Sequence, residues 1–317
     1  MNPRCLIIGG RGFIGTHLVN KLLKEKYIVR VFDMPDSSPS NNLFANEKVE
    51  YIYGDFREYQ TILNAMDKCD YCFHFASMTN PKSSNIDIKF DINSNLIGSL
   101  NILEAAVKHK IKKFIFMSSG GTVYGRSDGK IITENNHTDP ICSYGITKLA
   151  IEKYLQLYKI LFGLDSISLR LSNPYGEGQN PKSEQGAIAV FLGKCINNEQ
   201  IEIWGDGSVI RDYIYISDVI DACILCITKT YSVDFLNISS GNPMSLLHVL
   251  DCMELVTGKK IKRIFKDGRP FDVSFNVLSP ALANQILGWS PRVSFLDGLT
   301  KTVDWQINTY SNFQNNL

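Results

Sequence analysis

Residues that can move a proton lie near one another in the middle of the chain. Tyr144 and Lys148 are four residues apart, a spacing that places both side chains on one face of a helix. The lysine ammonium can stabilise a phenolate there, which makes the tyrosine a base near neutral pH. Ser119 precedes them and adds a hydroxyl. Because many surface helices carry a Tyr-x-x-x-Lys pattern by chance, its meaning depends on the elements around it.

A glycine-rich turn near the N-terminus supplies that context. Residues 4–8 form an apolar strand, the run Gly9–Gly15 follows, and an amphipathic helix comes next. Glycines allow a tight bend and a close approach to a pyrophosphate, and the helix N-terminus presents unpaired N–H groups to the phosphates. Together with the Tyr–Lys pair, this order predicts a nicotinamide-dependent enzyme that acts on an alcohol. The turn residues expected at the cofactor are Gly9, Gly12, Phe13, Ile14 and Gly15.

The second predicted strand indicates which dinucleotide is bound. It covers residues 28–32 and ends at Asp33, eighteen residues after Gly15. A carboxylate there accepts hydrogen bonds from the adenosine ribose and repels a 2′-phosphate. No Lys or Arg lies between Asp33 and Lys48 to attract such a phosphate. NAD is therefore expected rather than NADP, and the alternative is that Asp33 is a simple turn residue.

Composition and charge exclude several classes of protein. The chain has 317 residues, 44% hydrophobic and 21% charged, as in ordinary globular proteins. Its net charge of +1 gives no reason to expect nucleic acid or an anionic membrane as a partner. No apolar run reaches the roughly 18 residues that cross a bilayer, and the early strand leaves no room for a signal peptide. We expect a cytoplasmic protein.

Eight cysteines include two Cys-x-x-Cys pairs, Cys69/Cys72 and Cys223/Cys226. Such pairs can bind zinc. The first pair runs into an apolar strand and the second lies in an apolar helix without a glycine turn. We therefore interpret these thiols as small buried hydrophobic groups, and no metal is expected.

The order of elements predicts an α/β fold with a parallel sheet covered on both faces, because strand-length apolar runs alternate with helical patterns. Later strands are expected at 49–53, 71–75, 114–117 and 166–169, and helices at 58–67, 93–109, 144–162, 186–198 and 244–257. Residues 1–175 are assigned to the dinucleotide domain, with strands near 210–240 returning to it. Residues 176–317, mainly 176–208 and 241–317, form a smaller α/β lobe, in which a helix ends at Leu287 and Trp289 belongs to the core.

Ordered motifs along nearly the whole chain resemble the extended short-chain dehydrogenase/reductase superfamily, and within it the nucleotide-sugar 4-epimerases. They are Gly9–Gly15, Gly54-Asp55, His74-Phe75-Ala76, 95–98, Ser118–Gly125, Tyr144–Lys148, 173–176, 211–213 and 269–272. The resemblance implies a Rossmann-type doubly wound sheet, NAD as cofactor, a UDP-sugar as substrate and a homodimer.

The resemblance also implies roles for single positions. Tyr144 would be the catalytic base, with Lys148 beside it, and arginine forks would bind the substrate diphosphate. The implied cofactor positions are Asp33, Asp55, Phe56, Phe75, Ala76, Ser77, Asn95, Ser118, Tyr144 and Lys148. The implied substrate positions are Ser119, Thr122, Asn173, Arg211, Arg269, Asp272 and Asn276.

Three positions depart from the pattern of the family. Ile8 replaces a common Thr, and Thr79 stands where many relatives have a Lys that reaches the cofactor ribose. The largest departure is Gly120, where many relatives carry the catalytic Ser or Thr. Ser119 is the preferred source of the missing hydroxyl, and Thr122 is held in reserve.

The reaction implied is inversion at C4 of a nucleotide sugar through a 4-keto intermediate, with no net redox change. Dehydratases and decarboxylases of this superfamily need acid/base residues where Gly121 and Thr122 stand, which disfavours both. A net reductase and a non-catalytic dinucleotide-binding protein remain as alternatives. Asn276 matches a gate beside the sugar C2 group and is smaller than the Tyr that excludes N-acetyl groups. This favours UDP-N-acetylglucosamine, or a range that also includes UDP-glucose.

The homodimer would pair helices 93–109 and 144–162, as relatives do. Their apolar stripes comprise Leu96, Leu100, Leu103, Val107, Leu149, Tyr154, Leu155 and Tyr158. The alternative is that both stripes pack on the sheet, and the sequence does not distinguish the two.

Overall fold

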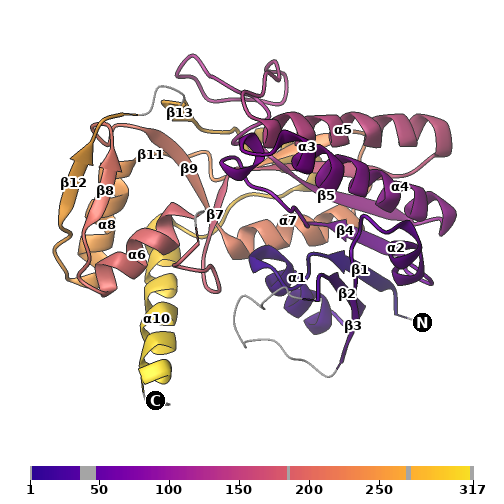
Figure 1. The fold of residues 1–317 in the computed structure, drawn as a ribbon, viewed down its shortest axis with the longest axis horizontal. Helices are drawn as coiled ribbons and strands as arrows, with labels where there is room; N and C mark the ends of the chain where they lie inside the picture. The colour runs from indigo at the N-terminus through magenta and orange to yellow at the C-terminus, as the bar shows by residue number, and fades with distance from the viewer. Residues whose placement is uncertain (1, 36–47, 184–185, 269–272, 315–317) are drawn as a thin grey trace.

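The computed structural model describes residues 2–35, 48–183, 186–268 and 273–314. Its largest element is a seven-stranded sheet in which every pairing is parallel (Figure 1). The strands, in spatial order, are β10 (Phe235–Ile238), β6 (Ser166–Leu171), β5 (Lys113–Ser119), β4 (Tyr71–His74), β1 (Arg4–Ile8), β2 (Ile28–Asp33) and β3 (Val49–Tyr53). The order reverses beside β1, which is where ligands bind in open α/β sheets.

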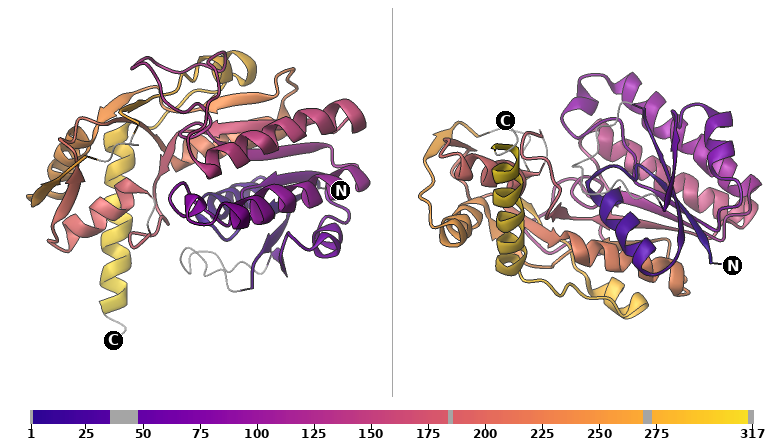
Figure 2. Two further views of the ribbon diagram at one scale, coloured as in Figure 1. Left: turned by 45° about the horizontal axis from the view of Figure 1, so that its top comes forward. Right: turned by 90° about the horizontal axis from the view of Figure 1, so that it is seen from below.

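Both faces of this sheet are covered, as predicted. Alternate residues of β1 supply two separate cores: Cys5 and Ile7 belong to one, and Leu6 and Ile8 to the other. The helices α1 (Phe13–Lys24) and α7 (Ile216–Thr228) pack on each other at the first core. The helices α2 (Tyr59–Ala65), α4 (Gly98–Lys108) and α5 (Ser143–Phe162) form the opposite layer (Figure 2). The predicted doubly wound fold is confirmed.

The helix expected at 93–109 begins earlier and is interrupted. A short α3 (Ile88–Asp91) follows the turn η2 (Ser83–Asn85), and a π-helical segment η3 (Ile92–Ile97) connects α3 to α4. Asp87 caps α3 by accepting a hydrogen bond from the Phe90 amide. A π turn widens a helix and is often found at functional sites, so this stretch is a candidate for a functional role.

The second lobe is built on β9 (Ile210–Tyr215), which pairs with β7 (Asn173–Tyr175), β11 (Pro243–Ser245) and β13 (Phe275–Asn276). A separate parallel pair joins β8 (Ile201–Trp204) and β12 (Arg263–Lys266). The helices of this lobe are α6 (Ala187–Ile196), α8 (Leu246–Thr257) and α10 (Phe295–Gln314), and α9 (Ala281–Leu287) lies near β10. Of the strands expected to return to the large sheet, β10 does so and β9 does not.

Two predictions about the core are confirmed. The four thiols of the Cys-x-x-Cys pairs are buried, and burial raises the pKa of Cys69 to about 11 and that of Cys226 to about 12. Trp289 is also buried, and its indole N–H donates to the Asp218 carbonyl over 2.9 Å. Within the described ranges, no helix has the length and apolar character needed to cross a membrane.

Candidate active site

A cavity of about 250 Å³ opens where β1, β2 and β4 end. Seven of the predicted cofactor residues line it: Gly9, Gly12, Asp33, Phe56, Phe75, Ala76 and Ser77. Sequence reasoning missed Arg11, Met34, Gly54 and Met78, which line it as well. Mostly apolar walls with a few fixed polar groups are typical of a cofactor site.

The glycine turn leaves no room for side chains and presents bare backbone to this cavity. Gly9 has a φ of +84°, and a Cβ there would lie 2.8 Å from the Ala76 nitrogen. A Cβ at Gly15 would lie 2.3 Å from the Gly9 oxygen. Gly12 caps α1 without a side-chain hydrogen bond, and the first turn of α1 has no acidic residue. The first N–H groups of α1 are therefore suited to a pyrophosphate, so these residues fit a dinucleotide.

Asp33 is fixed at the rim of the cavity by the backbone. One carboxylate oxygen accepts the Arg11 amide N–H over 2.9 Å, and the other accepts the Met34 amide N–H over 3.0 Å. Each oxygen keeps a lone pair for a ribose hydroxyl. The guanidinium of Arg11 lies 5.3 Å from the centre of the Tyr53 ring. The sequence signal that could have identified Arg11 is its position as a cation inside the glycine run.

Other predicted cofactor residues have different surroundings. Phe13 and Ile14 pack on the first core. The Asp55 carboxylate is bound by the Arg57 guanidinium, which lowers the pKa of that carboxyl group. The Ser118 hydroxyl donates to Glu152 over 2.5 Å. Roles for these four residues at the cofactor stay predictions.

Helix α5 carries both members of the Tyr–Lys pair at the edge of the sheet. The Lys148 ammonium donates to the Met117 carbonyl over 3.0 Å and lies 5.4 Å from the centre of the Tyr144 ring. Burial lowers the pKa of Lys148 to about 8, although the negative charges of Asp91 and Glu152 oppose this. Lys148 is therefore close to its titration range at neutral pH.

The surroundings of Tyr144 oppose ionisation of its phenol. Burial raises the pKa of its phenol, and the nearby Cys142 and Asp91 add to that rise. The Lys148 ammonium is hydrogen-bonded to the Met117 carbonyl on β5 and lies 5.4 Å from the centre of the Tyr144 ring. A positive charge added beside the ring would favour the phenolate further.

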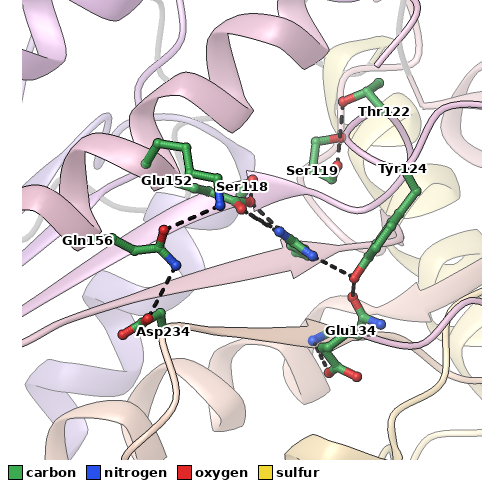
Figure 3. Close-up of polar contacts among 11 residues, drawn as sticks. Ser118, Ser119, Thr122, Tyr124, Glu134, Glu152, Gln156 and Asp234 are labelled. Carbon is green, nitrogen blue, oxygen red and sulfur yellow. Dashed lines mark hydrogen bonds and ion pairs between the residues drawn. The ribbon is translucent and has the colours of Figure 1, made fainter. Parts of the chain in front are cut away.

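The turn after β5 carries the hydroxyls of Ser119 and Thr122 (Figure 3). The Ser119 carbonyl accepts the amide N–H groups of Thr122 and Val123. Thr122 lies against Gly145, since a Cβ on Gly145 would be 3.1 Å from the Thr122 Cβ. At Gly120 a Cβ would be 2.2 Å from a Leu278 methyl group and 3.1 Å from the Arg170 oxygen. A hydroxyl at position 120 has no space, so Ser119 and Thr122 stay the two possible sources.

A buried ion pair ties this turn to α5. Arg170 on β6 holds Glu152 through two nitrogens, with the shortest contact at 2.7 Å. Its third nitrogen donates to the Tyr124 hydroxyl, which donates in turn to Asn237 (Figure 3). Glu134 extends the hydrogen-bond network by accepting the backbone N–H of Asn237. The network fixes the backbone on which Ser119 and Thr122 lie.

The predicted substrate residues come from the second lobe. Asn173 donates to the Asp212 carbonyl over 2.8 Å, and Arg211 lies beside Asn276 in the pairing of β9 with β13. Asn276 is 2% exposed and donates to the Gly120 carbonyl over 3.3 Å. Its own amide oxygen has no partner in the described part of the chain. Arg269 and Asp272 lie outside the described residues.

Comparison with known proteins identifies the family. The model of the NAD dependent epimerase/dehydratase family matches residues 5–239, most of the chain. The chain belongs to this family. NAD is therefore its cofactor, and the prediction of an NAD-dependent enzyme of this family is confirmed. The matched range ends at β10, the last strand of the large sheet.

Relatives of this epimerase/dehydratase protein align over almost their full length. A putative UDP-glucose 4-epimerase of Methanocaldococcus jannaschii is 33% identical over 96% of this chain and 98% of its own. A dTDP-4-dehydro-6-deoxyglucose reductase of Escherichia coli is 34% identical over 94% and 96%. The solved UDP-glucose 4-epimerase of Thermotoga maritima, with UDP-glucose, has a TM-score of 0.92 at 32% identity, covering 97% of this chain and 99% of that one. The nucleotide-sugar 4-epimerase group is thereby supported.

Proposed function

We propose that this protein inverts the C4 hydroxyl of a UDP-sugar by an NAD-dependent, redox-neutral reaction. The observation that carries the proposal is the position of Tyr144 and Lys148 on one face of α5, next to the turn that carries Ser119 and Thr122. The residues 1–175 would bind the cofactor, and the residues 176–317 would bind most of the substrate.

In this proposal the glycine turn and Asp33 would hold NAD+, which would supply reversible hydride transfer at C4 without net oxidation of the sugar. Tyr144 would take the proton of the C4 hydroxyl during oxidation and would return it to the C4 oxygen after the keto sugar has turned its other face to the cofactor. The positive charge of the oxidised cofactor would favour loss of the proton from the half-buried Tyr144. Lys148 retains its own proton and stabilises the phenolate.

The substrate lobe would hold the diphosphate while the keto sugar rotates. Arg211 on β9 and Asn173 on β7 lie in neighbouring strands, and Arg269 and Asp272 would complete the grip. Asn276, buried beside Gly120, has an amide oxygen that can accept a hydrogen bond from the sugar. A small residue here leaves room for an N-acetyl group, so UDP-N-acetylglucosamine is the preferred substrate and UDP-glucose the second.

The experiment incubates purified protein and NAD+ with UDP-N-acetylglucosamine and, separately, with UDP-glucose. Proton NMR of the anomeric region distinguishes the gluco and galacto epimers. An equilibrium mixture of C4 epimers without accumulation of NADH is the expected result. A protein that holds NAD and forms neither epimer would contradict the proposal.

Two variants assign the missing hydroxyl. Ser119→Ala is expected to reduce kcat strongly, because its hydroxyl makes no hydrogen bond within the described part of the chain and is available to the sugar oxygen. Thr122→Val should have the smaller effect, since its hydroxyl already approaches the Ser119 carbonyl at 3.5 Å. The opposite order of kcat values would assign the role to Thr122.

A net reductase is the second proposal, and the 34% identity to the Escherichia coli reductase is the observation in its favour. This reading requires a keto sugar that is consumed together with reduced cofactor in equal amounts. Incubation of dTDP-4-dehydro-6-deoxyglucose with NADH, followed by absorbance, tests it. Stoichiometric loss of NADH would favour the reductase over the epimerase.

We also propose a homodimer through the outer layer of helices. The predicted stripe is only partly suitable, because Leu103 and Leu155 are buried and Leu96, Leu100, Val107 and Tyr158 pack on the second core. A different apolar set on the same layer is exposed: Ile86, Ile88, Ile92, Ile97, Ile146, Leu157, Ile160 and Leu161. So large an apolar face is typical of an interface between copies. Sedimentation should show a dimer that Leu157→Lys weakens.

A further inference from the structure

Asp91 is a buried carboxylate to which the sequence assigned no role. It is the last residue of α3, a helix that lies beside α5 (Figure 1). Its side chain has no exposed surface. No cation lies within ion-pair distance of it among the described residues. Burial of an unpaired carboxylate is costly, so its surroundings must stabilise the charge through hydrogen bonds.

Its two oxygens face two different parts of the site. One oxygen accepts the hydroxyls of Ser143 over 2.6 Å and Thr147 over 2.8 Å. These residues precede Tyr144 and Lys148 on α5, so the contacts fix the two turns that carry the reactive pair. The other oxygen accepts the Thr79 hydroxyl and the Asn95 amide, the latter over 2.9 Å.

Asn95 carries the connection on to the cofactor cavity. Its amide oxygen accepts the Met78 backbone N–H over 2.7 Å and the Ser77 hydroxyl over 3.3 Å. Ser77 and Met78 both line the cavity. The π turn of η3 keeps Asn95 directed at Asp91 and at this wall at once.

We infer that Asp91 is a positioning residue that holds the helix of Tyr144 and Lys148 against the Ser77–Met78 wall of the cofactor cavity. Distances between reacting atoms must be kept within fractions of an ångström for catalysis, and a carboxylate that accepts from four donors on three segments is suited to that. The inference rests on the proposed function for its catalytic meaning, while the bridge itself is defined by the contacts.

The charge of Asp91 also acts on the pair that it positions. The titratable groups facing Tyr144 and Lys148 are Asp91 from α3, Cys142 and Glu152 from the region of α5, and His74 from β4. Asp91 raises the pKa of both Tyr144 and Lys148. Neutralising it should therefore shift the ionisation of Tyr144 to lower pH, whereas removal of its α5 donors should not.

Two variants separate position from charge. Ser143→Ala with Thr147→Val cuts the bridge on the α5 side and leaves the carboxylate in place, so we expect NAD+ affinity to fall about tenfold or more. Asp91→Asn keeps the shape and removes the charge, so we expect tyrosinate absorbance in the NAD+-loaded protein, corrected with Tyr144→Phe, to appear at lower pH. Asp218→Asn is the matched control, a buried carboxylate whose partners among the described residues are the Arg292 and Val293 backbone N–H groups.

The control should lower the unfolding temperature with no change in NAD+ affinity or tyrosine titration. If the double variant binds NAD+ as tightly as wild type and Asp91→Asn titrates as wild type, Asp91 is only structural and the inference is wrong. Neither readout needs sugar turnover, so a failure of the epimerase proposal leaves this test intact. If epimerisation is confirmed, kcat should fall more than KM rises in the double variant.

Discussion

Two polar clusters include residues of α5, one around Glu152 and one around Lys148. They differ in whether a buried charge has an ion-pair partner. Around Glu152 and Arg170 the carboxylate and guanidinium lie in direct contact, and Ser118 and Tyr124 satisfy their remaining groups. Lys148, one turn away, has a carbonyl and an aromatic ring for neighbours, and Phe116 lies 4.7 Å from its ammonium.

The difference separates a scaffold from a reaction centre. The first cluster balances its charges internally, so it needs nothing from a ligand. The second leaves the buried Lys148 ammonium without an ion-pair partner in the described chain, beside the half-buried phenol of Tyr144, and perturbed groups of this kind mark functional sites. A bound cofactor can then change their protonation, which a completed ion pair would resist.

The largest expected effect comes from exchanging the two tyrosines for phenylalanine. Tyr144→Phe should lower kcat by about 10²–10⁴, the usual contribution of a general base. Its stability should hardly change, because its hydroxyl makes no hydrogen bond within the described residues. Tyr124→Phe should leave kcat nearly unchanged. It should lower the free energy of unfolding by about 1–3 kcal/mol, since it leaves Arg170 and Asn237 without a buried partner. Urea unfolding and turnover of both variants measure the contrast, and equal losses of stability would break it.

Opening the ion pair is the next largest effect. Arg170→Met leaves Glu152 buried without its cation and should destabilise the fold by about 3–5 kcal/mol. Adding Glu152→Gln should recover much of that loss, because no unpaired charge remains. Lys159→Met is the control, since its pair with Asp234 is exposed and is worth less than about 1 kcal/mol. A small loss for Arg170→Met, measured by urea unfolding, would contradict the proposed division.

Lys148→Met should inactivate the enzyme and yet make it more stable. The pKa of Lys148 is about 8 when folded and 10.5 normally, so at pH 7 the folded protein carries a charge that burial disfavours. Removing it should stabilise by roughly 1–3 kcal/mol at pH 7. Between pH 8 and 10.5 the folded wild type releases the proton first and gains stability, so the advantage of the variant should vanish above that range. Unfolding curves of wild type and variant at pH 7 and pH 10.5 test this prediction. A stability difference between the two proteins that is the same at both pH values would contradict it.

The smallest effect concerns the turn between the clusters. Gly120→Ser should cost about 1–3 kcal/mol, because its Cβ meets Leu278 and the Arg170 carbonyl. It should not raise kcat, since the new hydroxyl has no space beside the sugar. In a Leu278→Ala background, Gly120→Ser should cost less stability than it does in the wild type, because part of the clash has been removed. Increased turnover in Gly120→Ser would show that the turn rearranges.

The local features of this protein could be predicted from its sequence. The glycine run, Asp33 and the strand–helix alternation depend on residues that are neighbours in the chain, so their spacing fixed both the fold class and one wall of the cofactor cavity. Tyr144 and Lys148 belong to one helix and needed no tertiary information to be paired.

Other features depend on contacts between distant segments. The Arg11 backbone N–H, after β1, donates to the Asp33 carboxylate at the end of β2. The Thr147 hydroxyl on α5 donates to the Asp91 carboxylate on α3. The same holds for Gly120, whose lack of space is caused by Leu278. Only packing shows such neighbours, and packing also buried Leu103 and Leu155 against the sheet while leaving Ile160 exposed.

The sequence by itself determined which groups can react, since residue type and local spacing define a base, a lysine and a phosphate-binding turn. The tertiary structure decided the direction in which their pKa values shift and which residues hold them in place. Burial, which no local pattern reports, raised the pKa of Tyr144 and lowered that of Lys148, and it made Asp91 the bridge between the reactive helix and the cofactor wall.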